Sequence, residues 1–471
     1  MKILLLRPKS KLYALSSVPP LGLGYLARAL LNRGFDVEIA DFNNRRCREN
    51  RLLEKWRKSP PDIIGLQLQS RDIAEGRVLI QRLRKWLGSS IPIVLGGPHP
   101  STMPEQVLED FSGADFAMLG EAEETLPKLV DYLGGTNHAT PEAVPGLVYK
   151  SNGALKINPT SPPVDIDQLD FPAWDLMTLD GYSQTEVFGG GFNRRAPAMT
   201  LLTSRGCPWQ CTFCCAKELY GRSLRLRNPE RIVDEMDILH RQYGFREIKI
   251  IDDNFNAVRR HVLEVGRVFQ QRPVDISTSF ACGLQIHNLD DEVLSVFKLL
   301  GASELMVAVE SGSQRVLSLM KKNIDLSQVP RKVDLIRHHG FKVILLFIIG
   351  YPGETREEIE QSVRMALELP IDRVHFNCFS PLPGTEIYRE LKSQNRLADF
   401  NTRNTHFDAI RYSFIPGLTA RQLNRLRQKA LLRFYWRPKI LLTLWASFHS
   451  WSGFKFLIYK ALVYFKGQGR D

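Results

Sequence analysis

The sequence lacks any long apolar run. No stretch of the 471 residues reaches the roughly 18 consecutive apolar residues that a membrane-spanning helix needs. The N-terminal segment MKILLLRPKSK returns to charge after a short apolar run, and it has no small-residue cleavage site of the kind found in signal peptides. We therefore expect a cytoplasmic protein.

Cysteine is also scarce, which excludes a disulfide framework. The chain has seven cysteines, and an odd count in a cytoplasmic protein points to metal ligation or free thiols. Cys207, Cys211 and Cys214 fall within eight residues of one another. This clustering favours metal ligation for these three.

Acidic residues are outnumbered, and the imbalance is local. The net charge is +12. From Leu418 to Asp471 there are eleven Lys or Arg residues and one acidic residue, so most of the excess lies in this tail. The distribution favours a local contact with an anionic partner, and we expect no dedicated nucleic-acid binding.

The first part of the chain alternates apolar strand patterns with amphipathic helix patterns. Such alternation predicts a doubly wound parallel sheet covered on both faces, in a Rossmann-like α/β domain over residues 1–135. Ligands of these sheets bind at the carboxyl ends of the strands. The expected strands cover residues 2–8, 36–42, 63–70, 91–97 and 116–121, and the expected helices cover residues 21–34, 44–58 and 76–88.

A different pattern follows this domain. Residues 136–197 are rich in Pro, Asp and Gly and are interpreted as a linker with a small hairpin at 146–157. Residues 198–416 carry six strand patterns, two short of a closed eight-unit barrel, and predict a partial (β/α)6 barrel. Residues 417–471 are expected to form a helical, basic and aromatic tail. The six strand patterns cover residues 199–204, 247–252, 276–281, 304–309, 343–348 and 373–379.

The cysteine cluster directly follows the first predicted barrel strand. Thiolates are suited to iron–sulfur clusters, and three ligands would leave one iron of a 4Fe–4S cluster open to a substrate. A zinc site more often combines two CxxC turns or adds histidine, and no matching second pair follows. We therefore predict that Cys207, Cys211 and Cys214 bind a 4Fe–4S cluster.

This CxxxCxxC motif, with Phe213 before its last cysteine and a partial barrel after it, resembles the radical S-adenosylmethionine superfamily. The resemblance implies that S-adenosylmethionine chelates the open iron and that its cleavage yields a 5′-deoxyadenosyl radical. It also implies S-adenosylmethionine contacts at the ends of later barrel strands. The candidates are Asp253, Glu310, Ser311, Gly350 and Gly353.

The N-terminal domain resembles the cobalamin-binding domain of cobalamin-dependent radical S-adenosylmethionine enzymes. Glycine-rich loops after the expected strands would let the backbone approach a large flat corrin. The DxHxxG motif that supplies an axial histidine in many cobalamin proteins is absent. The alternative for this domain is a flavodoxin-like module without corrin. The candidate cobalamin contacts are Pro20, Gly22, Gly96, Gly97, His99, Gly120 and Glu121, with His99 interpreted as a loop residue near the cofactor.

Four cysteines stand outside the motif. Cys215 adjoins it, and the resemblance provides no fourth ligand there, so a packed thiol is the preferred interpretation. Cys47, Cys282 and Cys378 lie on predicted elements and are interpreted as packing residues. A tRNA methylthiotransferase has a similar barrel but needs an N-terminal cluster on three cysteines, and residues 1–135 contain only Cys47.

The tail allows two interpretations. Basic residues interleaved with bulky aromatics, such as Phe434, Trp436 and Trp451, are typical of an interfacial helix on anionic lipid. A helical cap on the barrel is the alternative. The first would bring the protein to the inner face of the membrane as a peripheral protein.

The combined prediction is an enzyme that uses a 4Fe–4S cluster, S-adenosylmethionine and cobalamin. Methylation of an unactivated carbon in a small-molecule or lipid-like substrate is the preferred reaction, with a flavodoxin or ferredoxin as reductant. The alternatives are a non-methylating cyclase or rearrangement enzyme and a non-catalytic, membrane-recruited cofactor-binding scaffold, because fold alone does not separate reactions. The residues that contact the substrate are unknown.

Overall fold

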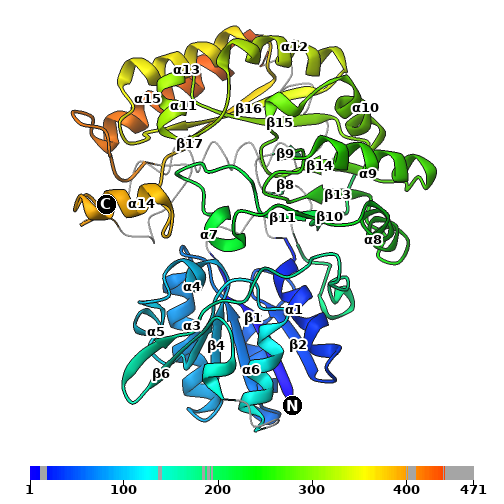
Figure 1. Ribbon diagram of the computed structural model, residues 1–471, viewed down its shortest axis with the longest axis vertical. Helices are drawn as coiled ribbons and strands as arrows, with labels where there is room; N and C mark the ends of the chain where they lie inside the picture. The colour runs from blue at the N-terminus through cyan, green and yellow to red at the C-terminus, as the bar shows by residue number, and fades with distance from the viewer. Residues whose placement is uncertain are drawn as a thin grey trace.

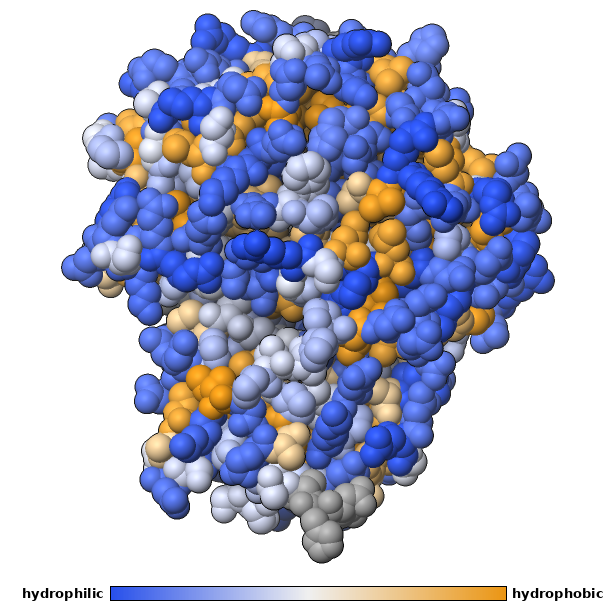
Figure 2. All heavy atoms as spheres, viewed as in Figure 1, coloured by the Kyte–Doolittle hydropathy of each residue, from blue (hydrophilic) through white to orange (hydrophobic). Residues whose placement is uncertain are grey.

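The computed structural model describes residues 1–10, 18–135, 140–182, 186–187, 191–192, 195–398, 400, 410–438 and 440. Figure 1 shows an N-terminal α/β domain below a larger curved α/β domain, and a connecting segment runs between them. The face seen in Figure 2 is mostly hydrophilic, with an apolar strip near the junction of the two domains. The α/β class predicted for both parts is confirmed.

The N-terminal sheet has the strand order β2-β1-β3-β4-β5-β6-β7. Its first five strands are parallel, in the order of flavodoxin-like folds. Apolar side chains point to both faces and form two separate cores, so the predicted doubly wound arrangement is correct. The strands are β1 (Lys2–Arg7), β2 (Asp36–Asp41), β3 (Ile63–Gln67), β4 (Ile93–Gly96), β5 (Phe116–Met118), β6 (Leu147–Ser151) and β7 (Ala154–Ile157).

Helices cover both faces of this sheet. On one face, α1 and α6 pack through residues such as Leu30 and Leu129. On the other, α2, α3 and α5 pack through residues such as Trp56 and Leu83. The helices are α1 (Leu21–Leu31), α2 (Glu49–Lys58), α3 (Ile73–Leu87), α4 (Pro98–Thr102), α5 (Val107–Asp110) and α6 (Thr125–Leu133).

The predicted hairpin forms, but it belongs to the sheet and not to a free linker. Strand β6 pairs antiparallel with β5, and β7 pairs with β6. The first domain therefore extends to Ile157, beyond the expected boundary at residue 135. Leu147 and Val148 are fully buried in this position, so the pairing completes the core.

The second domain contains the six predicted barrel strands. They form two parallel three-stranded sheets, β10-β13-β14 and β15-β16-β17. Among the described residues, one isolated bridge, between Leu284 and Val307, joins the two sheets, and the barrel is partial as expected. The strands are β10 (Ala198–Leu201), β13 (Glu247–Ile250), β14 (Ser277–Phe280), β15 (Glu304–Glu310), β16 (Lys342–Ile349) and β17 (Arg373–Cys378).

Helices follow most of these strands and cover the outside of the barrel (Figure 1). Several begin at a capping side chain: Asp290, Ser313 and Thr355 accept hydrogen bonds from backbone N–H groups of the first turn. The helices are α7 (Ala216–Tyr220), α8 (Pro229–Arg241), α9 (Arg259–Gln271), α10 (Asp291–Leu299), α11 (Gln314–Leu319), α12 (Val329–His338), α13 (Arg356–Glu368) and α14 (Glu386–Ser393).

The beginning of the basic tail forms helix α15 (Ala420–Tyr435), which packs on the barrel. Leu423 and Phe434 are fully buried in the barrel core, and the Tyr435 hydroxyl donates to the Val374 carbonyl at 3.0 Å. This helix therefore packs on the barrel beside β17. Most of the aromatic residues after it, from Trp445 onward, lie outside the described residues. No helix in the described part of the chain is long and apolar enough to span a membrane.

Candidate functional site

The three cysteines lie on one loop between the short strand β11 (Ser204–Arg205) and helix α7. The backbone N–H of Cys214 donates to the Cys211 carbonyl at 3.1 Å, which turns the loop back on itself. Burial raises the pKa of the Cys207 and Cys211 thiols. All three are free thiols, so their sulfur atoms are available as ligands.

The loop does not form a site for a single ion. Within the described ranges, no three His, Cys, Asp or Glu side chains converge on one metal position. A cubane cluster makes a different demand, because each cysteine thiolate binds a separate iron. Three free thiols on one loop fit that donor set.

Two hydrogen bonds hold the loop against the far side of the barrel. The Thr212 hydroxyl lies 2.6 Å from the Tyr351 hydroxyl, and the Thr212 N–H donates to the Met320 carbonyl at 3.0 Å. Thr212 is buried, so both contacts are shielded from water. The loop is therefore anchored to segments more than a hundred residues away in sequence.

The end of β13 places three consecutive polar residues with different roles beside the cysteines. Asp252 is buried and accepts hydrogen bonds from the Thr203 N–H at 2.6 Å and the Ser204 hydroxyl at 2.6 Å, so it fixes the start of the cysteine loop. Asn254, which follows the predicted contact Asp253, has its amide nitrogen 3.8 Å from the Cys207 sulfur. Burial, reinforced by the charge of Asp252, raises the pKa of Asp253 to about 6.

Glu310 ends β15 in a strained conformation. Its φ is +72°, and the register between β15 and β16 shifts at this point. The side chain is buried and lies 3.5 Å from the Lys322 ammonium. Burial raises the pKa of Glu310, although the Lys322 charge opposes that effect. Lys322 was missed because it lies in the turn after α11, where no motif identifies it.

Ser311 and the glycines after β16 shape the backbone nearby. The Ser311 hydroxyl accepts from the Ser313 N–H at 3.2 Å and is fully buried, so it stabilises a turn. Gly350 and Gly353 have φ values of +94° and +84°, conformations that favour glycine. The Gly350 N–H donates to Glu354 at 2.8 Å.

The candidate cobalamin residues lie at the carboxyl ends of the N-terminal strands. Pro20 precedes α1, and Gly22 is the exposed residue of its otherwise buried first turn. A Cβ added at Gly96 or Gly120 would meet no atom within 4 Å, so open space lies over these positions. Gly97 has a φ of +96° and passes close to the Leu68 backbone. Open space over glycine backbone fits the approach of a large flat cofactor.

His99 differs from this group. It lies in helix α4, not in a loop as predicted, and it is buried. Its Nδ1 is 3.2 Å from the Ser70 hydroxyl, and its ring packs edge-on against Phe111. Burial lowers the pKa of His99 to about 4, which keeps the imidazole neutral. These contacts are those of a core residue.

Glu121 joins the two domains. Its carboxylate binds Arg205 at 2.9 Å and Arg225 at 2.6 Å, and it also accepts from the Val164 N–H at 3.1 Å. Glu123 binds the same Arg205 guanidinium at 2.6 Å. A residue predicted to contact cobalamin is therefore ion-paired to the segment that leads into the cysteine loop.

The four remaining cysteines differ in exposure. Cys47 is partly buried and packs against one core of the N-terminal sheet, as predicted. Cys378 is buried in the barrel core, as predicted. Cys282 is exposed at the end of β14, so its interpretation as a packing residue is wrong. Its sulfur lies 3.9 Å from the Ile251 carbonyl oxygen, which places it near the polar end of β13. Cys215 is half-buried at the start of α7.

The fold and the site define a protein with a cobalamin-type α/β domain in front of a radical S-adenosylmethionine barrel. The Radical SAM superfamily model matches residues 201–366, and the B12 binding domain model matches residues 12–130. An uncharacterized methyltransferase of Pyrococcus horikoshii is 30% identical over 448 residues, which cover 94% of each chain. The chain belongs to the family of cobalamin-dependent radical S-adenosylmethionine enzymes.

Other relatives differ in the reactions that their names state. The cytidylyl-2-hydroxyethylphosphonate methyltransferase of Streptomyces wedmorensis is 28% identical, over 83% of this chain and 81% of its own length. The anaerobic magnesium-protoporphyrin IX monomethyl ester cyclase of Rubrivivax gelatinosus is 26% identical, over 82% of this chain and 68% of its own length. The fold is also that of the radical S-adenosylmethionine methyltransferase TsrM from Kitasatospora setae, with a TM-score of 0.68 and 21% sequence identity. The match covers 83% of this chain and 75% of TsrM.

Proposed function

We propose that this enzyme methylates an unactivated carbon of a small-molecule substrate. One observation carries the proposal: the cysteine loop and the carboxyl edge of the N-terminal sheet face each other across a buried ion cluster. Arg205 lies two residues before Cys207 and binds Glu121 and Glu123 from the segment after β5. A radical source and a methyl donor held on these two edges would lie on opposite sides of one substrate.

The residues on the barrel side fit a cluster and S-adenosylmethionine. Cys207, Cys211 and Cys214 would ligate three irons. Asp253 and Glu310 flank the loop and offer carboxylates to a cationic amino group, while Gly350 lets a flat base approach the backbone. Lys322 is buried beside Glu310, and its charge also acts on the Cys211 thiol. Its positive charge would favour thiolate ligands.

The residues on the sheet side fit a corrin without a histidine ligand. Gly96 and Gly120 would lie under the ring, because space is open there, and Gly22 is exposed at the same edge of the sheet. His99 makes core contacts and is not expected to bind the cobalt. When bound, S-adenosylmethionine and the cluster would supply a 5′-deoxyadenosyl radical that removes a substrate hydrogen, and methylcobalamin would supply the methyl group.

A second reaction has support from the relatives. The Rubrivivax relative is named as a cyclase, and the same two cofactor sites can serve ring formation. Relatives that are named methyltransferases, one of them matching nearly the whole chain, favour methyl transfer over ring formation. A lipid-like substrate and a flavodoxin or ferredoxin as electron donor remain part of the proposal, as does peripheral membrane contact through the tail.

The test is anaerobic turnover of the full-length protein with reconstituted cluster, cobalamin and S-adenosylmethionine carrying a labelled methyl group. A methyltransferase is expected to form S-adenosylhomocysteine as well as 5′-deoxyadenosine and to pass label to bound cobalamin. Formation of 5′-deoxyadenosine without S-adenosylhomocysteine or labelled cobalamin would favour the cyclase reaction. Failure to bind cobalamin would overturn both.

A further inference from the structure

A cavity of about 790 Å³ lies beside the carboxyl end of β2, apart from the residues considered above. Its walls are the end of β2, the turn at residues 44–48, the first turn of α2, and the connecting segment at residues 177–182. The sequence pattern predicted a helix over residues 44–58. The helix begins instead at Glu49, and the basic residues before it form one wall of the cavity.

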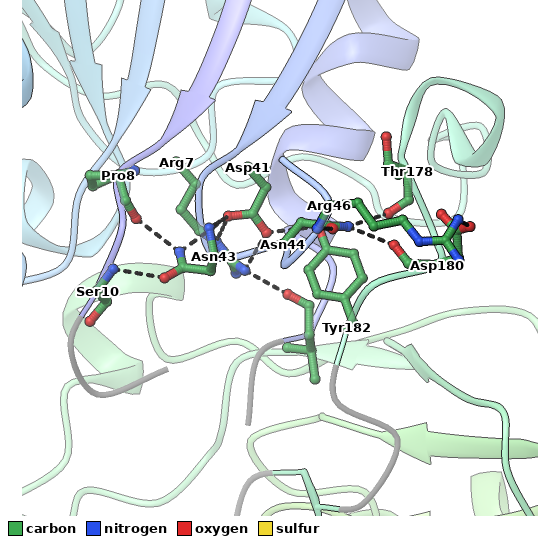
Figure 3. A network of polar contacts seen from close by, with 11 residues as sticks. Arg7, Pro8, Ser10, Asp41, Asn43, Asn44, Arg46, Thr178, Asp180 and Tyr182 are labelled. Atoms are coloured by element: carbon green, nitrogen blue, oxygen red, sulfur yellow. Dashed lines mark hydrogen bonds and ion pairs between the residues drawn. The ribbon is translucent and has the colours of Figure 1, made fainter. Parts of the chain in front are cut away.

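The floor of the cavity is held rigidly by buried polar contacts (Figure 3). Asp41 binds the Arg7 guanidinium through both oxygens, at 2.8 and 2.5 Å, and accepts from the Tyr182 hydroxyl at 2.7 Å. The Asn44 amide donates to the Thr178 and Asp180 carbonyls at 2.8 and 2.9 Å. Because these bonds join the turn to the connecting segment, the cavity is built in advance of any ligand.

The positive charges of the cavity are not balanced. Arg46 pairs with Asp180. In the described part of the chain, the exposed side chains of Arg45, Arg48 and Arg51 have no hydrogen-bond or ion-pair partner. All three line the cavity.

The two acidic residues of the lining do not offset these charges. The Glu38 carboxylate binds Lys55 at 2.7 Å and accepts from the Trp56 indole at 3.3 Å. Asp41 is neutralised by Arg7. Both acids are therefore committed to cations that do not line the cavity, and the space carries a net positive charge from the unpaired arginines.

We propose that this cavity binds a phosphate-bearing organic molecule. Guanidinium groups match phosphate oxygens in pairs, and a phosphate monoester carries a charge of about −1.5 to −2 at pH 7. Three unpaired arginines suit such a multiply charged group. The volume lies within the range of about 300–1,000 Å³ that is typical of small-molecule sites. Ile39, Leu52 and Met177 supply apolar surface for the organic part.

A recessed site favours a small molecule over a macromolecule. The cavity walls come from the sheet edge and from the connecting segment on its other side, so a small ligand would contact both walls. An RNA backbone or a lipid surface would instead use the outward basic side chains of α2. The proposal concerns binding alone and does not depend on the proposed methyl transfer.

The test is calorimetric titration of the full-length protein with inorganic pyrophosphate, at low salt and without divalent cations. Wild-type protein is expected to bind one equivalent. R48Q and R51Q should each weaken binding at least about tenfold, because hydrogen bonds to charged groups are among the stronger ones. R57Q is the matched control: Arg57 is exposed on the same helix but does not line the cavity, and this variant should bind like wild type.

Three outcomes would overturn the proposal. The first is absence of pyrophosphate binding by the folded wild-type protein. The second is equal weakening by R57Q, which would show a general charge effect. The third is that the wild-type protein binds anionic vesicles or single-stranded RNA but not pyrophosphate, and that R48Q and R51Q lose this binding. That result would assign the arginines to a macromolecular surface. Cobalamin and iron content, measured on the same samples, report separately on the proposed function.

Discussion

Replacing Arg205 with alanine should destabilise the junction of the two domains more than any surface substitution. The guanidinium is 6% exposed and binds two carboxylates of similar burial, Glu121 and Glu123. Burial disfavours the charged form, yet the two carboxylates outweigh it, and the pKa of Arg205 is raised. Its planar group also lies over the Tyr25 ring, 5.1 Å from the centroid.

The magnitude follows from what the substitution leaves behind. Glu121 would keep Arg225 as a partner, with contacts at 2.6 and 2.9 Å. Glu123 would lose the only cation that binds it among the described residues. Removing one partner of a buried ion pair typically costs about 3–5 kcal/mol, because the other charge stays buried without compensation. We expect a loss of that order in the free energy of unfolding.

The assay is urea unfolding, followed by fluorescence, of wild type, Arg205→Ala and Arg28→Ala. The Arg28–Asp175 pair is the matched control, since it joins the first domain to the connecting segment and its side chains are 31% and 59% exposed. Exposed pairs contribute about 0–1 kcal/mol. The double substitution Arg205→Ala/Glu123→Gln should recover part of the stability, because it removes the stranded charge.

Two results would refute this reasoning. One is a loss for Arg205→Ala no larger than that for Arg28→Ala. The other is a double variant less stable than Arg205→Ala, which would show that packing rather than charge accounts for the effect. Arg205→Lys separates charge from geometry. It should keep the positive charge but lose the simultaneous contact with Glu121 and Glu123, so its stability should lie between those of wild type and Arg205→Ala.

Four further predictions concern the cofactors, the buried carboxyls and the tail. Anaerobically prepared protein should hold about four irons, and Cys211→Ala should abolish both this iron and 5′-deoxyadenosine formation; full retention of iron would contradict the ligand assignment. Electron paramagnetic resonance of bound cob(II)alamin should show no axial nitrogen splitting, and a histidine splitting that disappears in His99→Ala would contradict the core role of His99. Burial raises the pKa of Glu354 from 4.5 to about 8, so the native state keeps a proton that the unfolded state releases; stability should fall as the pH rises from about 4.5 to about 8 and then level off. In urea titrations at several pH values, Glu354→Gln should lack this loss of stability. If wild type and Glu354→Gln lost stability in parallel as the pH rose, Glu354 would not be the group responsible. Truncation after Pro416 should destabilise the protein because α15 is packed in the core, whereas sedimentation with anionic and neutral vesicles at low and high salt tests the rest of the tail; equal, negligible binding throughout would remove the lipid interpretation.

The sequence was sufficient for the features that depend on short-range spacing. The distance between Cys207 and Cys214 is fixed by seven residues of chain, so three thiols on one loop follow wherever that loop lies. The six barrel strands and the first five sheet strands could also be predicted, because buried parallel strands appear as continuous apolar runs between amphipathic helices. The glycine-rich turns marked the carboxyl ends of the same strands.

Only the tertiary structure decided which distant side chains meet. Glu121 resembled a cofactor contact within its motif, but packing brings it to Arg205, 84 residues later in the chain. Lys322 becomes part of the site because its segment packs beside Glu310, and it has no spacing that signals this. His99 turns into the core for the same reason. Covalent geometry limits spacing over a few residues, whereas ion pairing and burial over longer separations depend on how whole elements pack, which the local pattern does not encode.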